Sequence, residues 1–132
     1  MDREAARALA QLSGVLPAAV PGPRALGEAL RGYLEAVQAD PGTWRLVLMP
    51  PEGAPELLRT RIARGRARVV AQLADAVRPG IGPGVPTPDP ELTAMTLSAL
   101  ADECARLVLS DPRRFPAERI VAHARWVLGL LR

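Results

Sequence analysis

Two arginines, Arg59 and Arg66, are the clearest starting point for chemistry in this sequence. On a helical wheel at about 100° per residue they share the apolar side of a helix predicted over 55–78 with Ile62 and Val69. A guanidinium can bind a carboxylate through two parallel hydrogen bonds, so the pair could line a cavity and hold an anionic ligand. Alternatively, both side chains extend to solvent or pair with an internal acid. The acids that could serve are Glu28, Glu35, Asp102 and Glu103.

Asp102 and Glu103 lie in an otherwise apolar stretch, and a buried carboxylate needs a partner. They could anchor a cationic effector or form ion pairs within the chain. The candidate partners are Arg59, Arg66, Arg106 and Arg125. No convincing nucleophile or metal set accompanies these carboxylates, which disfavours acid–base catalysis. We therefore expect that the chain is not an enzyme and has no cofactor.

The sequence contains one cysteine, Cys104, and one histidine, His123. One cysteine cannot form an internal disulfide, and two such residues cannot supply the four ligands of a structural zinc site. Cys104 is interpreted as a small buried apolar side chain, because no neighbouring pattern indicates a depressed pKa. For His123 a hydrogen bond at a dimer interface is favoured over metal ligation. We expect no metal site.

Composition restricts the classes of function. A chain of 132 residues with 48% hydrophobic residues suits one domain, spanning 1–132, with one core. All 17 basic residues are arginines, yet the net charge is only +3 and aromatic residues make up only 3%, which argues against nucleic-acid binding. No uncharged stretch of roughly 18 apolar residues and no signal peptide is evident. We therefore expect a cytoplasmic protein that does not associate with membranes.

Helical periodicity and Pro/Gly breaks predict an all-α fold of six helices. Thr43 is the predicted N-cap of the short third helix, and Asp89 that of the fifth, with Pro90 at its first position. The Pro/Gly-rich segment 79–90 is predicted to be a flexible loop. The predicted helices span about 2–16, 24–39, 44–49, 55–78, 90–109 and 116–131.

The last two predicted helices are apolar around most of their circumference, which a small monomer cannot bury completely. We therefore expect a homodimer in which these helices form an intermolecular four-helix bundle. A stripe of small residues at helical spacing would permit close approach. The alternative is that both helices form the centre of a monomeric core. The candidate interface residues are Ala94, Leu97, Ser98, Ala101, Ala105, Val108, His123, Val127 and Leu131.

Several apolar residues, with a few polar ones, could instead line a ligand pocket, because such pockets are mostly apolar. The alternative is that the apolar members belong to the ordinary core. The candidate ligand-binding residues are Tyr33, Val37, Trp44, Leu48, Met49, Leu58, Arg59, Ile62, Arg66, Met95, Ala99 and Glu103.

Five segments of the chain form a recognisable series: 33–37 followed by Asp40 and Pro41, the aromatic short helix 43–48, the arginine-rich 57–62, the helix opening 89–94 and the helix end 107–112. A final amphipathic helix follows Phe115. In these segments, and in the order and lengths of the predicted helices, essentially the whole chain resembles the C-terminal regulatory domain of TetR-family transcriptional repressors.

The resemblance implies a domain that binds a small-molecule effector among its first four helices and dimerises through its last two. Effector binding would shift the helix arrangement and release DNA. The helix-turn-helix domain that precedes this region in the family has no counterpart in the sequence, so this chain alone is not expected to bind DNA. The alternative is a dimeric helical scaffold or interaction module with no small ligand.

Overall fold

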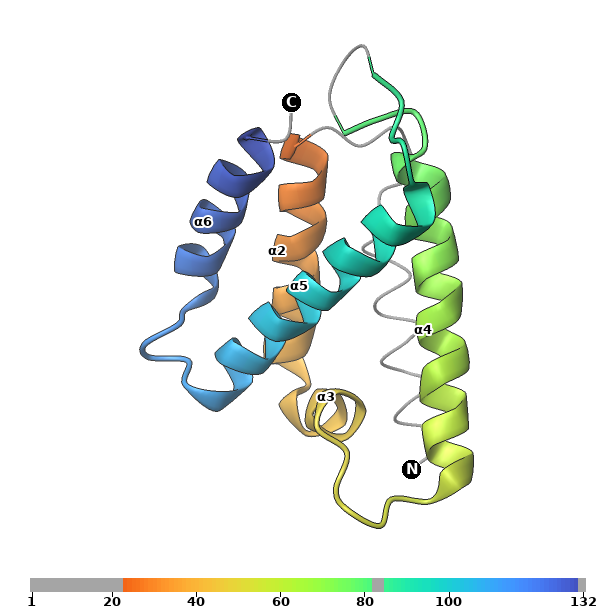
Figure 1. Cartoon of the computed structure of the whole chain (residues 1–132). Helices are drawn as coiled ribbons and strands as arrows, with labels where there is room; N and C mark the ends of the chain where they lie inside the picture. The colour runs from red at the N-terminus through yellow and green to blue at the C-terminus, as the bar shows by residue number, and fades with distance from the viewer. Residues whose placement is uncertain (1–22, 82–84, 131–132) are drawn as a thin grey trace.

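The computed structural model describes residues 23–81 and 85–130. This part of the chain forms five helices and no strand, which confirms the all-α class (Figure 1). The helix predicted over 2–16 and the interface candidate Leu131 lie outside the described residues. The helices are α2 (Pro23–Ala39), α3 (Pro41–Leu48), α4 (Glu56–Val77), α5 (Pro90–Ser110) and α6 (Ala117–Gly129).

The ends of α4 and α5 follow local sequence signals. The Asp89 carboxylate accepts a hydrogen bond from the backbone N–H of Leu92 at 3.0 Å, and Pro90 occupies the first turn, which confirms the predicted N-cap. Gly80 follows α4 with a φ of 120°, a conformation that favours glycine. Beyond it, the Thr87 N–H donates to the Arg78 carbonyl at 3.2 Å, which ties this part of segment 79–90 to the end of α4.

The predicted start of the short helix was wrong. It begins at Pro41, with Asp40 in the N-cap position, and the Trp44 N–H donates to the Asp40 carbonyl at 3.2 Å. The proline ring fixes φ near the helical value and its missing N–H costs nothing in the first turn. Thr43 is therefore a buried residue within α3 and not its cap.

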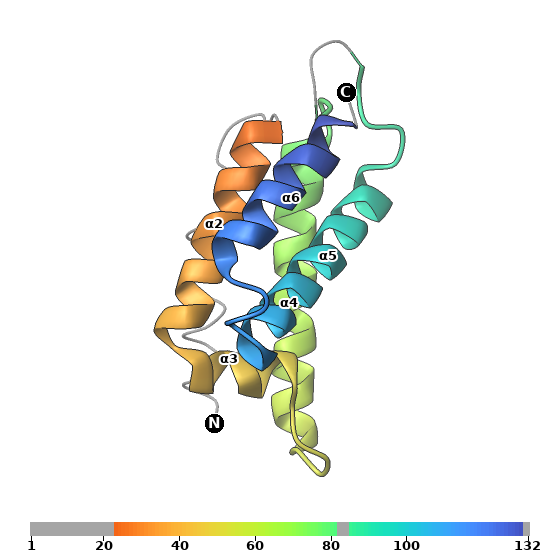
Figure 2. The same cartoon turned by 90° about the vertical axis from the view of Figure 1, so that its left-hand side faces the viewer.

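Helix α2 packs against α6 on one side and α5 on another, while α4 packs against α5 (Figures 1 and 2). Two hydrogen bonds join the C-terminal ends of α3 and α5. Arg45 donates to the Leu109 carbonyl and Arg106 donates to the Leu48 carbonyl, each at 3.3 Å. Each helix thus supplies an arginine that satisfies a terminal carbonyl of the other.

The core has two parts. The larger surrounds Trp44, which is 1% exposed and meets the Tyr33 ring edge-on at a centroid distance of 5.2 Å. The smaller joins the start of α2, the end of α4, the start of α5 and the end of α6, through residues such as Leu26, Val77 and Leu128. Between the two, α5 and α6 both contact α2 but do not pack closely against each other.

Candidate functional site: an apolar groove between α2, α5 and α6

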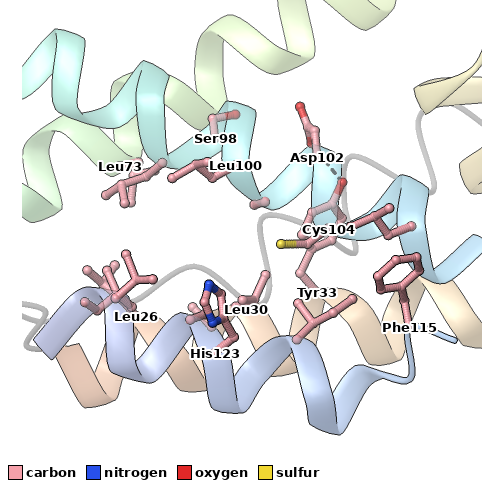
Figure 3. A pocket seen from close by; sticks show the side chains of 18 of the residues that line it. Leu26, Leu30, Tyr33, Leu73, Ser98, Leu100, Asp102, Cys104, Phe115 and His123 are labelled. Atoms are coloured by element: carbon pink, nitrogen blue, oxygen red, sulfur yellow. Dashed lines mark hydrogen bonds between the residues drawn. The ribbon is translucent and has the colours of Figure 1, made fainter.

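A groove of about 600 Å³ lies where α5 and α6 separate above α2 (Figure 3). This volume falls within the range of about 300–1,000 Å³ that is typical of small-molecule sites. Most of the lining side chains are apolar, as in most ligand pockets. The lining residues are Leu26, Ala29, Leu30, Tyr33, Val69, Leu73, Leu97, Ser98, Leu100, Ala101, Asp102, Cys104, Leu107, Phe115, Arg119, Ile120, His123, Ala124, Val127 and Leu128.

The two ends of the groove differ in chemistry. One end is mainly aliphatic, with Leu26 and Leu73 facing each other across it (Figure 3). The other end, near the α5–α6 connection, holds the Phe115 ring and the Arg119 side chain. On α6, lining residues recur at 119, 120, 123, 124, 127 and 128, so one continuous helical face forms the wall between the ends.

A buried polar cluster adjoins the groove. The Tyr33 ring lines it, and the Tyr33 hydroxyl donates to Asp102 Oδ1 at 2.9 Å. Arg66 Nη1 binds the other carboxylate oxygen, Oδ2. Asp102 is only 6% exposed, so these two partners supply the compensation that a buried carboxylate requires. The cluster joins α2, α4 and α5 through three side chains, one from each helix.

The environment also fixes the protonation of two groups at the groove. Burial, reinforced by the negative charge of Asp102, raises the pKa of Tyr33 far above its ordinary value. Burial and then the charge of Glu103 raise the pKa of the Cys104 thiol. Both groups therefore remain protonated at neutral pH, and Cys104 is not an activated nucleophile.

At the cationic end, the contacts of Arg119 leave its charge uncompensated. Its guanidinium stands 5.0 Å from the Phe115 ring centroid, and Nη1 donates to the Arg114 carbonyl at 2.7 Å. Among the described residues no carboxylate pairs with Arg119. One turn along α6, His123 also lines the groove, with its ring 5.8 Å from that of Trp126.

The predicted ligand-binding residues are spread over three environments. Tyr33 lines the groove, and Arg66 reaches it indirectly through Asp102. The buried core holds Val37, Trp44, Leu48, Leu58 and Ile62. The surface holds Met49, Arg59, Met95, Ala99 and Glu103, which do not line the groove.

The charged residues that were considered together, Arg59 with Arg66 and Asp102 with Glu103, also lie in different environments. Arg66 pairs with Asp102, as one of the alternatives held, whereas Arg59 is exposed and does not lie on the buried side of α4. Figure 1 shows α5 diverging from α4 toward the start of α4, which leaves that part of the helix face without cover from α5. Glu103 is exposed and lies 3.7 Å from Arg106, one turn along the same helix.

The predicted interface residues divide between the groove and the core. The groove contains Leu97, Ser98, Ala101, His123 and Val127. The interior contains Ala94, Ala105 and Val108, which are at most 2% exposed within the chain. On α5 the large apolar side chains of Leu92, Met95 and Leu100 are exposed. On α6 Trp126 is exposed, as is Leu130 directly after that helix.

Sequence reasoning did not identify the two ends of the groove. Leu26, Leu73 and Arg119 are not among the predicted site residues, and Phe115 enters the sequence analysis only as the residue before the final helix. A usable signal was present on the last helix, where Arg119 and His123 lie one turn apart on a face that continues through Val127. The change from cation to aliphatic residues along one helical face indicates an amphipathic wall.

Within the described ranges, no group of three metal-ligating side chains occurs and no helix is long and apolar enough to cross a membrane. Comparison of the chain with family models, curated proteins and solved structures gives no match. The resemblance to the TetR C-terminal domain thus stays a prediction, and the groove is the main structural basis for a functional hypothesis.

Proposed function

We propose that this chain is an effector-sensing and dimerisation domain of the kind found in TetR-family repressors, acting in the cytoplasm. The groove between α2, α5 and α6 carries this proposal, because its volume and mainly apolar lining suit a small organic molecule. This groove contains Tyr33 from the predicted ligand-binding set, whose other members lie outside it. A regulator of this kind would need a DNA-binding domain to act on DNA.

The mechanism follows from the position of the groove between two helices that do not pack closely together. A ligand that contacts both walls binds better to one separation of α5 and α6 than to another. It would therefore shift the population toward that separation. The predicted dimer interface involves the same two helices, so a change in their spacing would pass directly to the partner subunit and to any domain attached to it.

The test of the groove is binding of a neutral apolar dye such as Nile red, followed by fluorescence. Ala101 lines the groove, so Ala101→Trp should fill it and abolish saturable binding. Ala99 is exposed on the same helix outside the groove, so Ala99→Trp is the matched control and should bind like the wild type. If Ala99→Trp abolishes binding and Ala101→Trp does not, the groove is not the ligand site.

A second candidate is a dimeric scaffold without a small ligand, favoured by the exposed apolar side chains of α5 and α6. Leu100 and Trp126 are 55% and 62% exposed, and a partner that covers them would remove this apolar surface from water. In that case the partner would fill the groove, and dye binding and dimerisation would be mutually exclusive. A dimer that binds one dye per chain while keeping its mass supports sensing over the scaffold.

A further inference from the structure

We propose that the groove recognises an elongated amphipathic anion, such as an alkyl carboxylate, with its head group at Arg119 and its tail toward Leu26 and Leu128. This inference rests on the proposed function, since it names the ligand class of the same groove. It depends on the distribution of charge along the groove and on the length of the α6 wall.

The charge balance of the lining favours an anion. Asp102 is the sole acid among the lining residues, and both of its carboxylate oxygens are already bound, one by Tyr33 and one by Arg66. It therefore offers little attraction to a cationic ligand. Arg119 is the remaining full charge of the lining. The groove thus presents an uncompensated positive charge, with the N–H of the His123 ring as a further donor one turn away.

The contacts of Arg119 leave it able to bind a head group. Its recorded partners in the described structure are the Arg114 carbonyl and the Phe115 ring, neither of which neutralises its charge. A guanidinium has five N–H donors, so one bond to a carbonyl leaves several for a carboxylate. Two further acids are close in sequence, Asp111 and Glu118, and neither lines the groove.

The remainder of the groove suits an unbranched apolar tail. Positions 119 to 128 along α6 span about 13 Å at the rise of an α-helix, and the far end is lined by aliphatic side chains such as Leu26, Leu73 and Leu128. An extended alkyl chain of about ten carbons matches this length and would exclude water from Leu26, Leu73 and Leu128. A compact polar ligand would leave that end unfilled.

The experiment compares three ligands of equal tail length by isothermal titration calorimetry: decanoate, decanol and decyltrimethylammonium. We expect decanoate to bind more tightly than decanol, and the cation most weakly. Arg119→Gln should weaken decanoate binding about tenfold and leave decanol unchanged. Arg113→Gln removes an equal charge from an exposed residue outside the groove and is the matched control, expected to bind like the wild type.

Cys104 provides an independent measure of occupancy, because it is the sole cysteine of the sequence and lines the groove. Bound decanoate should slow alkylation of its thiol in the wild type. If decanol binds and protects Cys104 as well as decanoate does, or if both arginine variants lose affinity equally, anion recognition is overturned while ligand binding in the groove stands. If no ligand protects Cys104, both this inference and the proposed function fail.

Discussion

At the scale of single residues, Tyr33 connects the groove to the interior of the fold. Its ring forms part of the groove wall, while its hydroxyl binds the buried Asp102 carboxylate, which Arg66 compensates from α4. A ligand against the ring therefore contacts a side chain whose position is set by three helices. This arrangement ties the inner wall of the groove to three helices, in contrast to its exposed rim at Leu100 and Arg119.

The raised pKa of Tyr33 predicts how stability depends on alkaline pH. The phenol of the unfolded chain loses its proton above about pH 10, whereas burial and the charge of Asp102 keep the folded phenol protonated. The contribution of the Tyr33 phenol to the free energy of unfolding is therefore fully present below pH 10. It is lost as the pH rises further, by about 1.4 kcal/mol per pH unit. Tyr33 is the sole tyrosine, so phenolate absorbance during alkaline titration reports this one residue. The chain has no lysine, so no side-chain ammonium group titrates in the same pH range.

The expected result is that phenolate absorbance and loss of helical circular dichroism coincide. Tyr33→Phe should cost about 1–3 kcal/mol at neutral pH, because Asp102 loses a donor, and should flatten the alkaline dependence. A Cys104→Ala background removes the second group with a raised pKa. Phenolate forming near pH 10 in a chain that is still folded would contradict the assigned burial and hydrogen bond.

At the scale of helices, local signals predicted most of the architecture. Proline and glycine at the breaks placed α2, α4 and α5 within one or two residues of their observed bounds, because these residues act on the backbone directly. The error at α3 has a local cause as well, since Pro41 starts the helix before Thr43 can cap it. Helical periodicity identifies the apolar face of each helix, but it does not predict which other helix packs against that face. That depends on how the helices cross.

The N-cap of α5 gives a prediction at this scale. Asp89→Ala removes the acceptor for the Leu92 N–H and should lower the free energy of unfolding by about 1 kcal/mol, as measured in urea. Asp75→Ala is the control, with an equal change of charge. Asp75 is exposed near the end of α4 and pairs with exposed Arg78, so its loss should change stability little. Equal losses for both variants would show that charge, and not the cap, determines the effect.

At the scale of the whole molecule, the candidate site was not predicted in full, for a physical reason. A helical wheel separates apolar from polar faces, but an apolar face has the same pattern whether protein, ligand or a partner covers it. Val37 and Trp44 proved to be fully buried core, while Leu97 and Ala101 line an opening. The excess of apolar surface on the last two helices was visible in the sequence, and the structure locates part of it in the groove and part on the surface.

The exposed apolar side chains of α5 and α6 are the basis for predicting a dimer. Leu100 on α5 is 55% exposed and lines the rim of the groove, and Leu57 on α4 is 59% exposed away from it. The two leucines are thus similarly exposed on different helices, and replacing either by glutamate introduces one negative charge. We expect light scattering to give twice the mass of one chain for the wild type and for Leu57→Glu, and the mass of one chain for Leu100→Glu. An unpaired charge at the centre of an apolar interface opposes association, whereas one on an uncovered surface does not.

A folding control is essential to this comparison, because a monomer must not arise from unfolding. The two variants should therefore keep the helical circular dichroism of the wild type. If the wild type is a folded monomer, the apolar surface of α5 and α6 is not a self-interface. If instead Leu57→Glu separates the dimer and Leu100→Glu does not, the interface lies on α4. Either result would remove dimerisation through the last two helices while leaving ligand binding in the groove to its own tests.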